Sequence, residues 1–274
     1  MSNPLFYVGD GELAPASAGT TVVVSGAEAR HAAQVMRLSP GERVDVADGS
    51  GRRVSGTVRS AAPDRLEVTA ETVHDEPAPN PELVLVQALA KGDRDLLAIQ
   101  TATELGLDAV YPWQAERSIV RWKSGKTGKA DKTAKALAKW EAALLSAAKQ
   151  ARRTRVPRTE QVLDGVGVAS VCGPGSLVLV LHEDARTSLG EAVAESGLLA
   201  GQTVAERRPT GHAVERIVLV VGPEGGLSPA ETAALAEAGG LPVLLGRHVL
   251  RSSTAGPAAV AVLQQLLGRF GPRT

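Results

Sequence analysis

Leu219–Thr232 reads LVVGPEGGLSPAET, and this stretch decides the fold class. An apolar run ends in a glycine-rich loop, and a helix signal follows at once. Ser228 is the expected N-cap, Pro229 takes the first helical position, and Glu231 completes a capping box. A strand, a glycine loop and a helix in direct succession are typical of an α/β domain built on a parallel sheet.

A second unit of the same kind follows at Leu244–Leu263, LLGRHVLRSSTAGPAAVAVL. The sequence predicts that its helix begins at Ser253 or Thr254, because either residue is a suitable N-cap. Gly256 in the first turn lets another backbone approach closely. Loops that follow parallel strands meet at the carboxyl edge of the sheet, where ligands of open α/β sheets bind. The two glycine loops are therefore expected to share one site.

The rest of the C-terminal part alternates apolar strands with helices, which predicts a parallel sheet covered on both faces. The expected strands are Glu82–Leu89, Asp108–Trp113, Ser176–His182, Arg216–Gly222 and Leu241–Gly246. The expected helices are Asp93–Gly106, Gly128–Ala151, Leu189–Ser196, Pro229–Ala238 and Thr254–Leu267.

The N-terminal part reads as short β-branched strands, typical of a small barrel or sheet. These strands are expected at Leu5–Val8, Thr21–Val24, Arg43–Asp48, Arg52–Ser60 and Arg65–Val73. Ser25 and Glu28 suggest a capping box that opens a helix to about Arg37. The proline-rich stretch His74–Pro81 is typical of a linker. The sequence therefore predicts a β domain over residues 1–75 and an α/β domain over residues 82–274.

Composition narrows the class of protein. The chain has 274 residues and one cysteine, Cys172, which excludes an internal disulfide and a cysteine-based zinc site. No signal peptide opens the sequence, and no apolar run approaches the ~20 residues that span a bilayer. His, Asp and Glu show no metal-ligand spacing. We therefore expect a cytoplasmic protein with neither a membrane segment nor a metal.

Net charge is zero, but the charge is distributed unevenly. Arg117–Arg158 holds thirteen Lys or Arg residues and only two acidic ones. It also contains Trp122, Trp140 and the basic loop SGKTGK. A neutral chain with one strongly basic segment favours local docking of a polyanion, and these features favour nucleic acid over a merely solvated helix face.

The loop GPEGG does not match the phosphate-binding fingerprints. No Lys-Ser/Thr follows its glycines, as a P-loop requires, and the G-x-G-x-x-G pattern of dinucleotide folds is absent. Glu231 already occupies the helix N-terminus, and Glu224 would repel an anion. The loop suits a ligand such as adenine or an amino acid, read by backbone hydrogen bonds, with a cation nearby. A tight turn without a ligand is the alternative.

Taken together, GPEGGLSPAE and LLGRHVLRSSTA resemble the RsmE family of RNA methyltransferases in the SPOUT superfamily. The resemblance extends to KGDRDLLAIQTATELG, YPWQAERS and WEAALLSAAKQARRTRVP, so it covers nearly the whole chain. It implies a PUA-like β-barrel, then a SPOUT α/β domain with a trefoil knot, and a homodimer. Lys149, His248 and Ser253 depart from residues common in the family, so the resemblance assigns them no catalytic role.

The resemblance further implies methyl transfer from S-adenosylmethionine to N3 of a uridine in 16S ribosomal RNA of the small subunit, without a metal. The implied cofactor-binding residues are Leu181, His182, Gly222, Pro223, Glu224, Gly225, Gly226, Leu245, Gly246, Val249, Leu250, Arg251, Thr254 and Ala255. The RNA-binding candidates are His31, Arg37, Arg117, Arg152, Arg153 and Arg155.

Methylation at N3 needs the proton removed and the resulting charge on the base stabilised. Arginine suits this task because its fork meets carbonyl oxygens and stays charged. Arg251 and Arg153 are the expected catalytic arginines. Glu224 is a third catalytic candidate, and the alternative roles for its carboxylate are to anchor the loop or to favour a cationic ligand. Two alternatives remain open: a methyltransferase acting on another RNA, and a non-catalytic RNA-binding protein of ribosome assembly.

Overall fold

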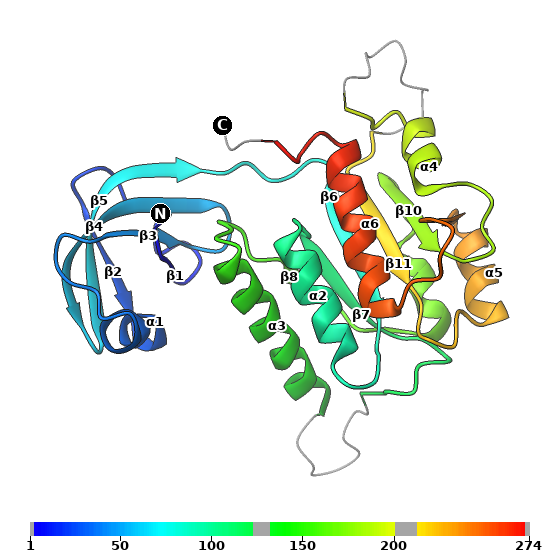
Figure 1. Cartoon of the computed structure of the whole chain (residues 1–274), viewed down its shortest axis with the longest axis horizontal. Coiled ribbons are helices and arrows are strands. Elements are labelled where there is room, and N and C mark those ends of the chain that lie inside the picture. Colours follow the sequence, from blue (N-terminus) through cyan, green and yellow to red (C-terminus); the bar gives the residue numbers. More distant parts are fainter. Residues whose placement is uncertain (1–2, 123–131, 201–212, 272–274) are drawn as a thin grey trace. The chain divides into compact units, whose positions relative to one another are not determined.

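The computed structural model describes residues 3–122, 132–200 and 213–271. The chain divides into two compact units (Figure 1). The N-terminal unit is Met1–Ala78 with Ala148–Val156, and the C-terminal unit is Pro79–Ala147 with Pro157–Thr274. The sequence did not indicate that Ala148–Val156 belongs with the N-terminal strands.

The N-terminal unit is built on a five-stranded sheet in the order β1-β3-β4-β5-β2. Strand β1 pairs parallel with β3 and the other pairs are antiparallel, so the sheet is mixed. Alternate residues of these strands, with Phe6 and Leu13, form its apolar core. The strands are β1 (Leu5–Tyr7), β2 (Thr21–Ser25), β3 (Arg43–Ala47), β4 (Arg52–Ala62) and β5 (Arg65–Asp75), which confirms the predicted strands.

The helix after β2 differs from the prediction. Ser25 is the N-cap, but its side chain makes no capping hydrogen bond, so the predicted capping box is wrong. The Glu28 carboxylate instead pairs with Lys149 Nζ at 2.7 Å. Helix α1 (Gly26–Arg30) continues as the π-helix η1 (His31–Val35) and stops there. Arg37 adopts a left-handed φ of 54° and lies outside the helix.

Ala148–Val156 is held to the N-terminal sheet by polar and apolar contacts. The Tyr7 hydroxyl donates to the Arg153 carbonyl at 2.6 Å, and burial raises the pKa of Tyr7. Lys149 Nζ lies 5.2 Å from the centre of the Phe6 ring, a cation–π contact. Ala148 packs with Leu5 and Tyr7 in a small apolar cluster. Part of the predicted basic segment is therefore structural.

The predicted linker begins later than the sequence suggested. His74 and Asp75 are the last residues of β5, where they pair with Arg53 and Arg52 of β4. The prediction that they belong to the linker was wrong, because the first proline is Pro77 and nothing before it interrupts the ladder.

The C-terminal unit is built on a parallel sheet, as predicted. Among the described residues this sheet has seven strands in the order β12-β10-β11-β6-β7-β8, with β9 also paired to β7. All its pairings are parallel. The strands are β6 (Glu82–Ala88), β7 (Ala109–Gln114), β8 (Arg158–Thr159), β9 (Leu163–Asp164), β10 (Ser176–Leu181), β11 (Arg216–Val221) and β12 (Leu241–Val243).

Helices cover both faces of this sheet. Val84 and Val86 of β6 face the core shared with η2 and α5, whereas Leu85 faces α6. Helices α2 and α6 pack side by side on the α6 face (Figure 1). A Cβ on Gly256 would lie 3.1 Å from Leu85 Cδ1, so glycine allows the expected close approach of α6 to β6. The helices are α2 (Arg94–Glu104), α3 (Lys132–Gln150), the 3₁₀ helix η2 (Gly165–Val171), α4 (Leu189–Glu195), α5 (Pro229–Glu237) and α6 (Ser252–Leu266).

The two tryptophans of the basic segment pack against each other. Their rings are perpendicular, with centroids 5.5 Å apart, and Trp140 is buried on α3. Trp140 therefore belongs to the core of the C-terminal unit and offers no face to a nucleobase. The SGKTGK loop lies outside the described residues. No helix within residues 3–122, 132–200 and 213–271 combines the length and apolarity needed to cross a bilayer.

Candidate functional site

A pocket of about 480 Å³ lies at the carboxyl ends of β10, β11 and β12. Its wall comes from the three loops that follow these strands, so the two glycine loops meet there as predicted. The volume is within the range of small-molecule sites, about 300–1,000 Å³. The lining residues are Leu181, His182, Glu183, Val221, Gly222, Pro223, Glu224, Gly226, Leu227, Leu244, Leu245, Gly246, Arg247, His248, Val249, Leu250, Arg251, Ser252 and Ala255.

The loop after β11 is a tight turn that needs its glycines. The Gly226 N–H donates to the Pro223 carbonyl at 2.9 Å, and Gly226 has a φ of 70°, a left-handed value that favours glycine. A Cβ on Gly222 would lie 2.6 Å from Leu227 Cδ1. Leu227 is buried in the core of the unit, so it ties the end of the turn to the sheet.

Helix α5 begins with the predicted capping box. The Ser228 hydroxyl accepts from the Glu231 N–H at 3.1 Å, and the Glu231 carboxylate accepts from the Ser228 N–H at 2.8 Å. Glu231 is fully buried. Its second oxygen accepts from the Glu116 N–H at 2.7 Å. A carboxylate of the protein therefore occupies the helix N-terminus, which is unsuited to a phosphate.

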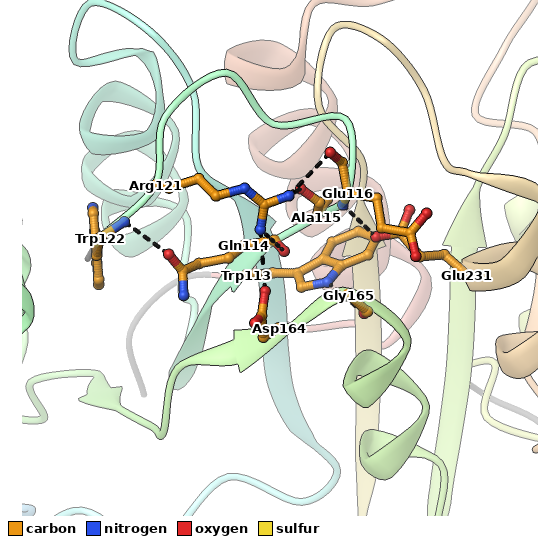
Figure 2. A network of polar contacts seen from close by, with 9 residues as sticks. All are labelled: Trp113, Gln114, Ala115, Glu116, Arg121, Trp122, Asp164, Gly165 and Glu231. Atoms are coloured by element: carbon orange, nitrogen blue, oxygen red, sulfur yellow. Dashed lines mark hydrogen bonds and ion pairs between the residues drawn. The ribbon is translucent and has the colours of Figure 1, made fainter. Parts of the chain in front are cut away.

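The loop after β7 is organised by Arg121 (Figure 2). Its guanidinium donates to the carbonyls of Ala115 and Glu116 at 3.2 and 3.0 Å and pairs with Asp164 at 3.2 Å. The Trp122 N–H donates to the Gln114 side chain at 2.7 Å. These contacts fix the turn that presents the Glu116 N–H to Glu231 at the start of α5.

The same turn places Arg117 on the glycine loop. Arg117 Nη1 donates to the Gly225 carbonyl at 3.0 Å. A Cβ on Gly225 would lie 3.2 Å from Arg117 Cβ. Gly225 is not among the residues that line the pocket and faces Arg117 instead. Arg117, a predicted RNA contact, therefore supports the loop in this structure.

Glu224 forms an ion pair that was not predicted from the sequence. Arg94 Nη1 lies 3.1 Å from Glu224 Oε1, and both side chains are partly exposed. The charge of Glu224 is thus partly balanced, and its carboxylate is tied to the start of α2. This contact favours the anchoring role for Glu224 over that of a free base.

Helix α6 begins earlier than predicted. Its N-cap is Arg251 and its first residue is Ser252, so the expected start at Ser253 or Thr254 was wrong. The Arg251 carbonyl accepts from the Thr254 and Ala255 N–H groups at 2.8 and 2.9 Å. Thr254 does not line the pocket.

The Arg251 side chain is exposed at the pocket wall. It has no hydrogen-bonded or ion-pair partner among the described residues. Ser252 is buried beside it, and its hydroxyl finds no partner in the same part of the chain.

Comparisons with known proteins identify the family. Residues 76–264 match the family model described as an RNA methyltransferase domain, and residues 24–71 match an RNA methyltransferase PUA domain. The chain is 37% identical over 271 residues to ribosomal RNA small subunit methyltransferase E, or RsmE, of Mycobacterium bovis. That match covers 97% of this chain and 93% of the relative. The chain belongs to the RsmE family.

Solved structures support the RsmE assignment. A crystal structure of the Neisseria gonorrhoeae enzyme bound to S-adenosyl methionine superposes with a TM-score of 0.77 at 28% identity. The superposition covers 97% of this chain and 98% of that one. The RsmE sequence of Bacillus subtilis is 28% identical over 236 residues, 86% of each chain. The N-terminal unit therefore contains a PUA domain, and the C-terminal unit is an α/β methyltransferase domain.

The predicted RNA-binding residues of this RsmE family member, apart from Arg117, lie in the N-terminal unit. Arg155 Nη2 donates to the Glu76 carbonyl at 2.7 Å, and Arg152 has a left-handed φ of 57°. Both side chains are half-buried, and the hydrogen bond of Arg155 lies within the unit itself. His31 is half-buried near Phe6, whereas Arg37 is exposed.

Several residues that line the pocket were not predicted from the sequence. Glu183, Arg247 and Ser252 line the pocket next to predicted residues, so their position in the chain was the available signal. His248, a departure from the family pattern, also lines it. The other two departures do not: Lys149 pairs with Glu28, and Ser253 follows the pocket residue Ser252.

Proposed function

We propose that this protein transfers a methyl group from S-adenosylmethionine to N3 of a uridine in 16S ribosomal RNA of the small subunit. The observation that carries the proposal is the pocket formed by both glycine loops at the carboxyl edge of the sheet. The curated relatives are named for methylation of small-subunit ribosomal RNA, and the Neisseria gonorrhoeae structure holds the methyl donor.

The residues of the pocket fit S-adenosylmethionine. Both glycine loops line the pocket, and backbone N–H and C=O groups of such loops suit the edge of adenine. The buried Ser252 hydroxyl gains a partner if a ligand group reaches it. The wall carries both signs of charge, Glu183 and Glu224 against Arg247 and Arg251, as suits a ligand with a carboxylate and two cationic centres.

The bound donor supplies an electrophilic methyl on a sulfonium, and the protein must orient an RNA base toward it. Uracil N3 becomes nucleophilic when it loses its proton, which leaves negative charge on the flanking carbonyl oxygens. The Arg251 guanidinium lines the pocket without a partner among the described residues, and we propose that it stabilises this charge. We propose Arg153 as a second arginine that stabilises this charge. The alignment of donor and acceptor supplies much of the rate.

The first experiment measures donor binding and methyl transfer directly. Calorimetry with S-adenosylmethionine should show binding by the folded protein. Incubation with small subunits that lack the modification should then give 3-methyluridine at one position, detected by mass spectrometry. Folded protein that does not bind the donor would support a non-catalytic assembly role. Methylation of transfer RNA alone would support a methyltransferase with another RNA substrate.

Gly225→Val tests the glycine turn. The added side chain collides with Arg117 and displaces the turn, since a Cβ alone already lies 3.2 Å from Arg117 Cβ. We expect the affinity for S-adenosylmethionine to fall at least ~10-fold, with RNA affinity unchanged. Gly190→Ala is the control, because a Cβ there meets nothing within 4 Å. Equal donor affinity in Gly225→Val and the wild type would remove this turn from the site.

Arg37→Gly tests the RNA-binding surface of the PUA domain. Glycine accepts the left-handed φ of 54°, so this change removes a charge without straining the backbone. If Arg37 contacts a phosphate, the slope of log affinity against log salt should become shallower by about 0.7 to 0.9. Binding of an RNA fragment from the small subunit, titrated with salt, gives this slope. An identical slope in both proteins would exclude Arg37 from the interface.

The RsmE family further implies a trefoil knot in the α/β domain and a homodimer, and we include both in the proposal. Light scattering of the purified protein tests the dimer, for which we expect twice the mass of the chain. A substrate in ribosomal subunits also implies that the protein acts in the cytoplasm.

A further inference from the structure

Arg94 joins two segments that lie 130 residues apart in the sequence. Its Nη1 is 3.1 Å from Glu224 Oε1, with 47% of the arginine side chain and 36% of the glutamate side chain exposed. Glu224 lines the pocket and Arg94 does not. Arg94 therefore reaches the pocket only through its partner.

Arg94 lies at the start of α2, between the N-cap residue and a buried residue. Asp93, the N-cap of α2, has a left-handed φ of 57°. Asp95 is buried, and its carboxylate accepts from the Leu96 N–H at 2.8 Å. Burial raises the pKa of Asp95, although backbone hydrogen bonds oppose the shift. The residue that follows Arg94 is therefore held inside the C-terminal unit.

Helix stability gives no reason for an arginine at this place. Arg94 is the first residue of α2, and a cation in the first turn of a helix opposes the helix dipole. Exposed ion pairs add little to folding stability. Arg94 destabilises the helix and adds little to folding stability, so its effect on Glu224 better explains an arginine at this position.

We infer that Arg94 is a positioning residue of the methyl-donor pocket, an inference that rests on the function proposed above. Arg94 holds the Glu224 side chain on one flank of the turn Pro223–Gly226, while Arg117 holds the Gly225 carbonyl on the other. The turn is therefore fixed before the ligand arrives. Preorganisation of this kind improves affinity by reducing the cost of ordering the loop on binding.

The test compares Arg94→Met with Lys139→Met. Arg94→Met should weaken binding of S-adenosylmethionine about three- to fivefold, the upper end of the range for one surface ion pair. It should weaken binding of the demethylated product by the same factor, because the turn contacts the part that both share. The KM for the donor should rise while kcat at saturation stays unchanged, and Arg94→Lys should recover much of the loss. Lys139→Met breaks the neighbouring exposed ion pair, 2.8 Å long, between Lys139 and Asp93. It should leave the donor affinity, the product affinity, KM and kcat unchanged.

Glu224→Gln completes a double-mutant cycle. If Arg94 acts through Glu224, the donor affinity of the double variant should be no lower than that of the single variant with the lower affinity. The inference would be overturned if the losses of donor affinity in the two single variants multiply in the double variant. It would also be overturned if Arg94→Met binds the donor like the wild type. Either result would leave the proposed function intact. A wild-type protein that fails to bind the donor would overturn both.

Discussion

Arg251→Ala is expected to lower kcat for methylation about 100- to 1,000-fold, the loss seen when one donor to a developing oxyanion is removed. The side chain lines the pocket and has no partner among the described residues, so its charge is free for a substrate. The fold should persist, because Arg251 caps α6 through its carbonyl, which alanine also has. Steady-state kinetics at saturating donor and subunit measure the effect.

Two variants sharpen this test. Arg251→Lys keeps the charge without the fork and should recover only part of the rate. Arg247→Ala removes another exposed arginine of the same pocket wall. We expect KM to rise less than about tenfold and kcat to stay unchanged, because only uniform binding is affected. If Arg251→Ala retained more than a third of the wild-type kcat, the proposed charge stabilisation would be excluded.

Glu231→Ala is expected to lower the free energy of unfolding by about 2–4 kcal/mol. Glu231 is fully buried and accepts from the N–H groups of Ser228 and Glu116. Truncation leaves both donors without an acceptor and removes the link between the β7 loop and α5. Thermal or urea denaturation measures the loss, and donor affinity should fall with it because the glycine turn directly precedes Ser228.

Glu191 provides a matched control. Helix α4 begins with the same capping box, Ser188 with Glu191, but Glu191 is exposed and water can replace its carboxylate. Glu191→Ala should therefore cost only about 1 kcal/mol, the ordinary value of a cap. Equal losses in Glu231→Ala and Glu191→Ala would show that the second hydrogen bond, to Glu116, contributes nothing.

Much of the fold could be predicted from the sequence because its signals are local. Apolar runs such as Arg216–Val221 gave the parallel strands, and Ser228 with Glu231 gave the start of α5. The same local pattern failed at Ser25 and Glu28, where an ion pair with distant Lys149 takes the carboxylate. Tertiary contacts override local propensity, and they cannot be read from a short window of sequence.

The candidate site divides in the same way. Both glycine loops were found from their spacing, and Gly222 and Gly246 line the pocket. Partners such as Arg94 for Glu224, or Arg117 for the Gly225 carbonyl, lie more than a hundred residues away in the chain. Only the sheet order brings them together. The half-buried Arg155 likewise shows that a basic residue in a charged run can serve the fold.

A crystal structure of the protein grown with S-adenosylmethionine tests the central claim most directly. We predict that the ligand occupies the pocket at the carboxyl ends of β10, β11 and β12, against the Pro223–Gly226 turn and the loop before Arg251. A structure with this pocket empty and the ligand bound at another place would contradict the account.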